Sequence, residues 1–389
     1  MSEQRQGPLV GLKVVELAGI GPAPLGCTLL ADMGASVLRV DRNVPSGLGS
    51  ARGGPKTDLL RRGRQSVSVD LKQPEGIETV LKLVEEADAL IDPFRPGVTE
   101  RLGLGPDDCL ARNPRLLYAR MTGWGQAGPL SHAAGHDLNY LSLTGITHSI
   151  GPKELPTPPL NVVADMGGGA MFLAFGLLAG VYEAQRSGHG QVVDVSMLEG
   201  SAFLALGIFG ARAAGHWKDE RQANMLDGGA PFYRCYETSD QKFVSVAAIE
   251  TKFYAILLDK LGLATANDLP EQMDRDRWPE LAARFEALFR EKTRDEWCAI
   301  MEGTDICFAP VLSLGEAFDH PHNQSRDSFV SIEGVMQPGP APRFSRTPGK
   351  VSRPPPEYGA DTEQGLAEWG FSADDIARLS DAGVVGWKA

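Results

Sequence analysis

The 389-residue chain lacks the features that mark several broad classes of protein. It has only five cysteines, widely scattered and without a Cys-x-x-Cys pair, which predicts reduced thiols rather than a disulfide framework or a zinc site. Basic residues are in deficit, at 38 against 50 acidic residues. This balance argues against a general nucleic-acid binder, because neutralising many phosphates needs a basic face.

Long apolar segments are also missing. The first eight residues contain no apolar run typical of a secretory signal. The longest uncharged stretch, Met166–Tyr182, covers 17 residues and includes several glycines, whereas a membrane-spanning helix needs about 20 apolar residues. We interpret this stretch as a buried helix and expect a cytoplasmic protein with no membrane partner.

Strands and helices alternate through the first half of the chain. A valine-rich run at Leu12–Leu17 is followed by a Gly-Pro turn, a helix over residues 25–33 and a second strand at Ser36–Val40. Similar apolar runs recur near residues 66–70, 89–91, 116–121 and 192–196. This alternation predicts a large Rossmann-like α/β domain with a parallel sheet over residues 1–210.

A smaller α+β domain is expected over residues 228–325. Two strand-like segments, Phe232–Thr238 and Lys242–Ala248, flank a polar turn and predict a hairpin, and helical segments follow it. Residues 330–389 begin with a proline-rich stretch and end with Ser372-Ala-Asp-Asp375 before an apolar run, which predicts a capped helix. We expect this C-terminal segment to return and complete the large domain.

The first turn superficially resembles a dinucleotide-binding fingerprint, because glycines follow a strand and Asp41 lies about 20 residues further on. The glycine spacing does not fit that pattern, however. Pro22 and Pro24 also remove backbone N–H donors that a pyrophosphate would need. The sequence therefore favours a tight turn beside a different ligand.

Basic residues gather in the segments that follow the predicted strands. They are Arg39, Arg42, Arg61, Arg62, Arg64, Lys72 and Arg95. In a net-acidic chain this concentration favours an anionic ligand with several phosphates. A solvated basic face explains the same spacing equally well, and the residues alone leave both interpretations open.

Three segments contain candidate catalytic side chains. His136 follows a glycine-rich loop, Asp165 precedes an apolar helix and the run Gly167–Gly169, and Glu250 ends a predicted strand. Each has a structural explanation on its own: a lone histidine, a helix N-cap and a surface carboxylate. Three glycines in a first helical turn are costly for a simple cap, but they would let backbone N–H groups approach a developing anion.

Longer motifs resolve part of this ambiguity. The chain resembles the alpha-methylacyl-CoA racemases of CoA-transferase family III (the CaiB/BaiF type) over residues 12–346. The matching segments, in the family's order, are VVELAGIGPAP, RVDR, VDLK, RPGVTERLGLGP, LLYARMTGWGQ, GHDLNY, PLNVVADMGGG, GQVVDVSM, NMLDGGAPFY and VAAIE.

The resemblance implies an interlocked homodimer and an isomerase of fatty acid metabolism. Such an enzyme inverts the α-carbon of a 2-methylacyl-CoA thioester by two-base 1,1-proton transfer through an enolate. The proton-transfer pair maps onto His136 and Asp165, with Glu250 orienting the histidine. The sequence departs from the family pattern at Thr251-Lys252, directly after this glutamate.

The resemblance also assigns the ligand contacts. Coenzyme A enters as part of the acyl-CoA substrate, so neither a separate cofactor nor a metal is expected. The CoA contacts map onto Arg42, Val69, Asp70, Leu71, Lys72, Arg95, Gly135, Asp137, Leu138, Asn139 and Tyr140.

Two other functions remain as alternatives. In a family III CoA-transferase, Asp165 would be a nucleophile that forms an acyl anhydride. Such transferases typically lack the Gly-His-Asp segment found here at residues 135–137 and have a run of glycines in the small domain. A non-catalytic acyl-CoA-binding protein would need the basic residues but not His136, Asp165 and Glu250.

Overall fold

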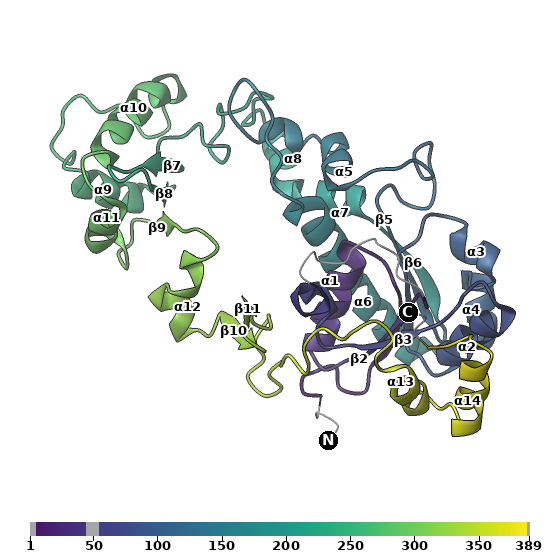
Figure 1. Cartoon of the computed structure of the whole chain (residues 1–389). Helices are drawn as coiled ribbons and strands as arrows, with labels where there is room; N and C mark the ends of the chain where they lie inside the picture. The colour runs from purple at the N-terminus through teal and green to yellow at the C-terminus, as the bar shows by residue number, and fades with distance from the viewer. Residues whose placement is uncertain (1–4, 44–53, 387–389) are drawn as a thin grey trace. The chain divides into compact units, whose positions relative to one another are not determined.

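The computed structural model describes residues 5–43 and 54–386 and shows two compact units (Figure 1). Unit 1 comprises Met1–Thr144, Leu160–Leu204 and Asp327–Ala389. Unit 2 comprises Gly145–Pro159 and Ala205–Arg326. The chain therefore leaves unit 1 and returns to it twice.

Unit 1 is built on a six-stranded parallel sheet with the order β3-β2-β1-β4-β5-β6. Its strands are β1 (Lys13–Leu17), β2 (Ser36–Asp41), β3 (Gln65–Ser68), β4 (Ala89–Asp92), β5 (Leu117–Thr122) and β6 (Gln191–Ser196). This is the doubly wound order, in which the direction of winding reverses between β1 and β4. The predicted parallel α/β architecture is confirmed.

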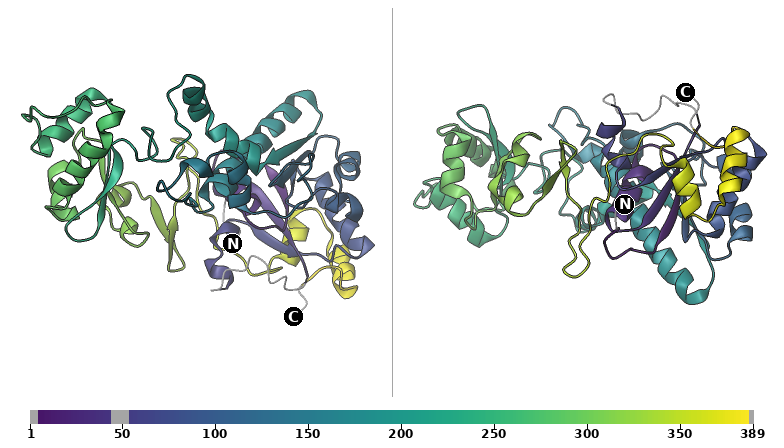
Figure 2. Two further views of the ribbon diagram at one scale, coloured as in Figure 1. Left: turned by 90° about the horizontal axis from the view of Figure 1, so that it is seen from above. Right: turned by 60° about the horizontal axis from the view of Figure 1, so that its bottom comes forward.

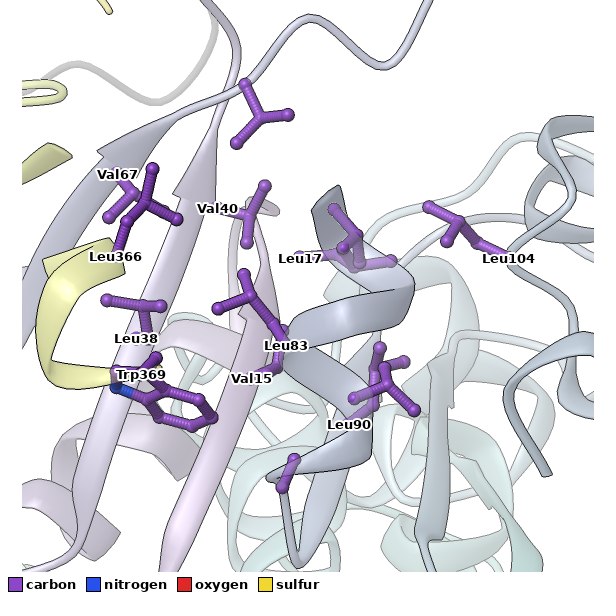
Figure 3. Close-up of a cluster of buried hydrophobic side chains, with 14 of the residues drawn as sticks. Val15, Leu17, Leu38, Val40, Val67, Leu83, Leu90, Leu104, Leu366 and Trp369 are labelled. Carbon is purple, nitrogen blue, oxygen red and sulfur yellow. The ribbon is translucent and has the colours of Figure 1, made fainter. Parts of the chain in front are cut away.

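One face of the sheet is covered by helices from both ends of the chain. They are α2 (Pro74–Glu85), α4 (Pro106–Arg112), α13 (Thr362–Glu368) and α14 (Ala373–Asp381). Figure 3 shows Leu366 and Trp369, from α13 and its C-cap, beside Leu38 and Val67 of the strands. The predicted cap of α14 is confirmed, because the Ser372 hydroxyl accepts from the Asp375 N–H at 3.1 Å.

Figure 2 shows α13 and α14, in yellow, against the sheet of unit 1 from two further directions. The C-terminal segment also covers the edge strand β3. Asp361 accepts a hydrogen bond from the Ser66 N–H at 2.9 Å, and Val385 forms an isolated antiparallel bridge with Val69. The edge of the sheet is therefore not left open to other strands.

The opposite face is covered by α1 (Pro22–Asp32) and α6 (Phe172–Ser187), and a buried charge cluster lies under α1. The Glu16 carboxylate pairs with the guanidinium groups of Arg39 and Arg64, both at 2.5 Å. Arg64 also donates to the Pro24 carbonyl at 3.0 Å and to the Thr28 hydroxyl at 2.7 Å. Glu16 thereby links β1 to β2 through Arg39, and to the first turn of α1 through Arg64.

Four of the seven clustered basic residues serve structure. They are Arg39, Arg61, Arg62 and Arg64, none of them more than 7% exposed and each in an ion pair with Glu16, Asp32 or Asp41. Neither the phosphate-site nor the solvated-face interpretation applies to these four. The spacing of the arginines does not show this, because their counter-charges come from three other elements of the chain.

The predicted helix within Met166–Tyr182 is longer and less regular than expected. A π-helix, Val162–Met171, leads directly into α6, and the continuous helix Val162–Ser187 is by length and composition apolar enough to cross a membrane. Leu173, Leu177 and Val181 are buried in α6, which packs against β5 and β6. Only 33% of the apolar window is buried, and Phe175 and Tyr182 are 73% and 63% exposed, so the expected buried helix is buried on one side only.

Three further helices belong to unit 1. They are α3 (Val98–Leu102), α5 (Asp137–Leu143) and α7 (Met197–Leu204), and a short hairpin of β10 (Phe329–Ile332) and β11 (Val335–Pro338) opens the C-terminal segment. Two of these helices, α5 and α7, pack against the π-helix Val162–Met171.

Unit 2 contains a three-stranded antiparallel sheet of β7 (Tyr233–Glu237), β8 (Phe243–Ala247) and β9 (Phe308–Val311). The predicted hairpin is therefore confirmed as β7–β8. Its helices are α8 (Leu206–Ala213), α9 (Thr251–Lys260), α10 (Trp278–Phe289), α11 (Arg294–Met301) and α12 (Pro321–Ser325). Aromatic rings fill its core, with Tyr236 stacked on Phe289 at a centroid distance of 4.9 Å.

We predict that Glu16→Ala lowers the free energy of unfolding by about 3–5 kcal/mol, because it leaves buried guanidinium groups without their counter-charge. Urea denaturation of the variant and of wild type measures this difference. Glu78→Ala, which breaks an exposed pair with Arg112, is the matched control and should change stability little.

The difference between wild type and Glu16→Ala should shrink in acid. Burial alone would raise the pKa of Glu16, but the charges and hydrogen bonds of Arg64 and Arg39 bring it below its ordinary value. A lowered folded-state pKa adds stability that is present at neutral pH and lost as the pH falls through that pKa. An effect no larger than that of the control would contradict the role of the cluster.

Candidate active site

The site lies where the winding of the sheet reverses. A Cβ atom built on Gly19, in the turn after β1, would lie 2.5 Å from the Cβ of Pro93, directly after β4. These two turns are therefore in close contact at the carboxyl ends of β1 and β4. Doubly wound sheets bind their ligands in the crevice at this position.

Three exposed basic side chains follow the carboxyl ends of three strands of the sheet. Arg42 comes after β2, Lys72 after β3 and Arg95 after β4. These are the members of the predicted basic cluster that the described structure leaves exposed. Parallel strands end at the same edge of a sheet, so the three residues lie on the ligand-binding side.

The Val69–Lys72 turn is fixed by its own hydrogen bonds and by the C-terminal segment. The Asp70 N–H donates to the Val384 carbonyl at 2.8 Å, and the Asp70 carboxylate accepts from the Lys72 N–H at 3.1 Å. Val69 is buried and Leu71 packs against the core. Lys72 is the one exposed residue of this turn, and contact of any of the four with a ligand stays a prediction.

His136 is exposed and is the N-cap residue of α5, where its N–H donates to the Asn139 side chain at 3.0 Å. The preceding loop is held by aromatic packing. The Tyr140 hydroxyl donates to the Gly135 carbonyl, and its ring meets that of Trp124 edge to face at 4.7 Å. A Cβ on Gly135 would lie 2.7 Å from the Tyr140 ring, so glycine is required there.

The other residues of the segment 135–140 differ in their exposure to solvent. Leu138 and Asn139 are exposed on α5, whereas Asp137 is 6% exposed and its carboxylate is turned inward. Asp137 Oδ1 accepts a hydrogen bond from the Asp165 backbone N–H at 2.7 Å. The segment predicted to bind CoA thus also contacts the second catalytic candidate.

Asp165 is half-buried in the π-helix and lies at the same reversal of the sheet. A Cβ on Gly21, at the start of α1, would lie 3.6 Å from Asp165 Oδ2. The same oxygen accepts from the Asn161 side-chain amide at 3.3 Å. Asn161 was not among the residues that sequence reasoning identified, and its spacing of four residues before Asp165 was the available signal.

The environment raises the pKa of Asp165 above its ordinary value. Burial is the largest cause, the Asn161 hydrogen bond opposes it, the charge of Asp137 adds to it and His136 opposes it. Burial and the charge of Asp165 also raise the pKa of Tyr140, while Arg95 lowers it. Asp165 and Arg95 act on Tyr140, and His136 acts on Asp165, so these residues share one electrostatic neighbourhood.

The run Gly167–Gly169 serves packing rather than anion binding. A Cβ on Gly168 would lie 2.4 Å from the Ser201 hydroxyl, and one on Gly200 of α7 would lie 2.0 Å from the Gly168 carbonyl oxygen. Residues inside a helix also commit their N–H groups to the helix itself. The expectation that these glycines approach a developing anion is therefore replaced by a close crossing of two helices.

Glu250 belongs to unit 2, where it is exposed and is the N-cap residue of α9. Its carbonyl accepts from the N–H groups of Phe253 and Tyr254, both at 2.9 Å. The orientation of His136 by its carboxylate stays a prediction. Within residues 5–43 and 54–386, no three His, Cys, Asp or Glu side chains form a group that could hold a metal ion.

Comparison with known proteins assigns the family. The sequence model of CoA-transferase family III matches residues 9–362. The chain belongs to CoA-transferase family III. It is 45% identical over 380 residues to an alpha-methylacyl-CoA racemase of Mus musculus, and the alignment covers 97% of each chain.

Two further comparisons agree with this assignment. The chain is 43% identical over 382 residues to an alpha-methylacyl-CoA racemase of Homo sapiens, again with 97% of each covered. A crystal structure of a CaiB/BaiF family protein from Brucella suis superposes with a TM-score of 0.80 over 94% of this chain and 100% of the other. At 24% identity that structure supports the fold alone.

Proposed function

We propose that the protein is an isomerase that inverts the α-carbon of 2-methylacyl-CoA thioesters. The observation that supports this proposal is the 2.7 Å hydrogen bond from the Asp165 N–H to Asp137, the residue after His136, which brings the segments of the two candidate proton carriers together. Full-length similarity to two alpha-methylacyl-CoA racemases, at 43–45% identity, supports the same reaction.

Inversion requires a base on one face of the α-carbon and an acid on the other. One of His136 and Asp165 accepts the α-proton, which leaves an enolate, and the other donates its proton to the opposite face. The next turnover in the reverse direction uses the two groups in exchanged roles. The raised pKa of Asp165 makes its carboxylate a stronger base than that of an ordinary aspartate, which suits the group to accept as well as to donate a proton.

The exposed basic residues would bind the phosphates of coenzyme A. Arg42, Lys72 and Arg95 are accessible at the strand ends and have no role in the buried ion pairs described above. The remaining expected CoA contacts are Val69, Asp70, Leu71, Gly135, Asp137, Leu138, Asn139 and Tyr140. Coenzyme A would be part of the substrate, and no further cofactor is proposed.

The same proposal includes a role for Glu250, an oligomeric state and a cellular compartment. Glu250 would hydrogen-bond to His136 and orient it in a homodimer of interlocked subunits. The enzyme would act on acyl-CoA in the cytoplasm, without a membrane or nucleic-acid partner. Unit 1, which contains most of the large domain expected over residues 1–210 and 330–389, would bind CoA, and the small domain expected over residues 228–325 lies within unit 2.

The alternative of a CoA-transferase uses Asp165 as a nucleophile and needs a second carboxylic acid as acceptor. It gives no role to His136, which is exposed at the start of α5 and acts electrostatically on Asp165. A passive acyl-CoA-binding protein gives no role to either residue. Both alternatives predict no loss of the α-hydrogen.

We predict that the purified protein exchanges the α-hydrogen of a 2-methylacyl-CoA for deuterium in D₂O and equalises the two enantiomers, with no acceptor acid present. Mass spectrometry follows deuterium, and chiral chromatography of the hydrolysed acid follows configuration. Transfer of CoA to an added acid without deuterium uptake would instead establish the transferase.

Substitution of either proton carrier should leave a different residual exchange activity. His136→Ala and Asp165→Ala should each nearly abolish racemisation, because inversion uses both groups. Each variant should keep slow exchange for one enantiomer only, and the two variants should prefer opposite enantiomers. Glu250→Ala should lose less activity and shift the pH profile. Near-normal racemisation by His136→Ala would rule out the two-base scheme.

Arg42→Ala and Arg95→Ala should each weaken binding of a CoA thioester by roughly tenfold or more, the scale of a lost charge-assisted hydrogen bond. Isothermal titration with an unreactive acyl-CoA analogue measures this loss. Arg112→Ala, an exposed arginine paired with Glu78 and Glu85, is the control and should bind as wild type does. Unchanged affinity in both test variants would contradict the proposal that these arginines bind the phosphates of coenzyme A.

A further inference from the structure

The π-helix that contains Asp165 changes the hydrogen bonding of one backbone N–H. The Asn161 carbonyl accepts from the Met166 N–H at 3.3 Å, which is a spacing of five residues. In an α-helix the partner of this carbonyl would be the N–H of Asp165, four residues on. The wider register therefore releases the Asp165 N–H from its own helix.

The released N–H donates to Asp137 Oδ1 at 2.7 Å. Asp137 is the first residue of α5 and directly follows His136, so this one bond joins the two segments that contain the proton carriers. The other oxygen, Asp137 Oδ2, is buried and has no hydrogen-bond partner within the described part of the chain. A buried, half-satisfied carboxylate is costly and calls for an explanation.

We propose that Asp137 is a positioning residue for proton transfer: its carboxylate holds Asp165 at a fixed place relative to His136, and the π-helix exists to free the N–H that it binds. This inference rests on the proposed racemase function. Local π-helical turns occur often at functional sites, and this one has an identifiable purpose. The cost of burying Asp137 is then explained by catalysis rather than by stability.

Three substitutions separate positioning from other roles. Asp137→Asn keeps an oxygen that can accept from the Asp165 N–H, Asp137→Ala removes the acceptor, and Asp137→Glu keeps the charge but moves the oxygen by one methylene. The control is Asp88→Ala, which removes a similar bond far from the site, since Asp88 Oδ2 accepts from the Lys13 N–H at 2.8 Å.

Asp137→Ala should lower kcat for racemisation by about 100-fold, the scale expected when a reacting group is misplaced by about 1 Å, while KM changes little. Asp137→Asn should recover most of kcat, and Asp137→Glu should recover less although it retains the charge. Asp88→Ala should change neither constant. A rise in KM at constant kcat would mean that Asp137 only contacts CoA, and equal losses in the Asn and Ala variants would also overturn the proposal.

A second measurement does not depend on activity. Hydrogen exchange of the Asp165 amide should speed up in Asp137→Ala and stay slow in Asp137→Asn and Asp88→Ala. If Asp137→Ala does not fold, the comparison of the Asn and Glu variants with wild type still tests the proposal. Absence of racemisation by wild type would refute the proposed function, whereas unchanged amide protection in Asp137→Ala would refute the positioning role.

Discussion

The active-site region of unit 1 depends on a carboxylate that lies beneath it. Glu16 in β1 neutralises Arg39 from β2 and Arg64, the residue before β3. Arg64 also donates to the Pro24 carbonyl and the Thr28 hydroxyl of α1. These bonds fix where α1 begins. Gly21 immediately precedes that helix and lies against Asp165, so the buried cluster indirectly determines one wall of the site.

Desolvation offsets much of the attraction in buried ion pairs of this kind, so the pairs add less net stability than their short distances suggest. Here the charges link β1, β2 and the residue before β3, and Arg64 extends the link to α1. Arg62 extends the same principle to the C-terminal segment, since it pairs with Asp32 at 2.6 Å and donates to the Gln337 side chain at 2.8 Å. Close packing completes the arrangement where Gly200 meets the Gly168 carbonyl.

The sequence predicts what local rules control and misses what distant partners decide. Strand–helix alternation, the β7–β8 hairpin and the Ser372 cap each depend on residues within a few positions, and all three are confirmed. The burial of Arg64 depends on Glu16, which lies 48 positions away. The register of the π-helix depends on Asp137, 28 residues before Asp165, and no periodicity of apolar residues reveals it.

The way the C-terminal segment completes unit 1 has a consequence for synthesis on the ribosome. The edge of β3 is covered by Asp361, Thr362 and Val385, and Leu366 and Trp369 fill the core under α13. All of these residues leave the ribosome after unit 2 has been made. The first strands of the sheet must therefore wait, with an uncovered face and an unpaired edge, until residues 361–385 have been synthesised. During that interval the nascent chain presents a surface on which chaperones can act and at which aggregation can begin.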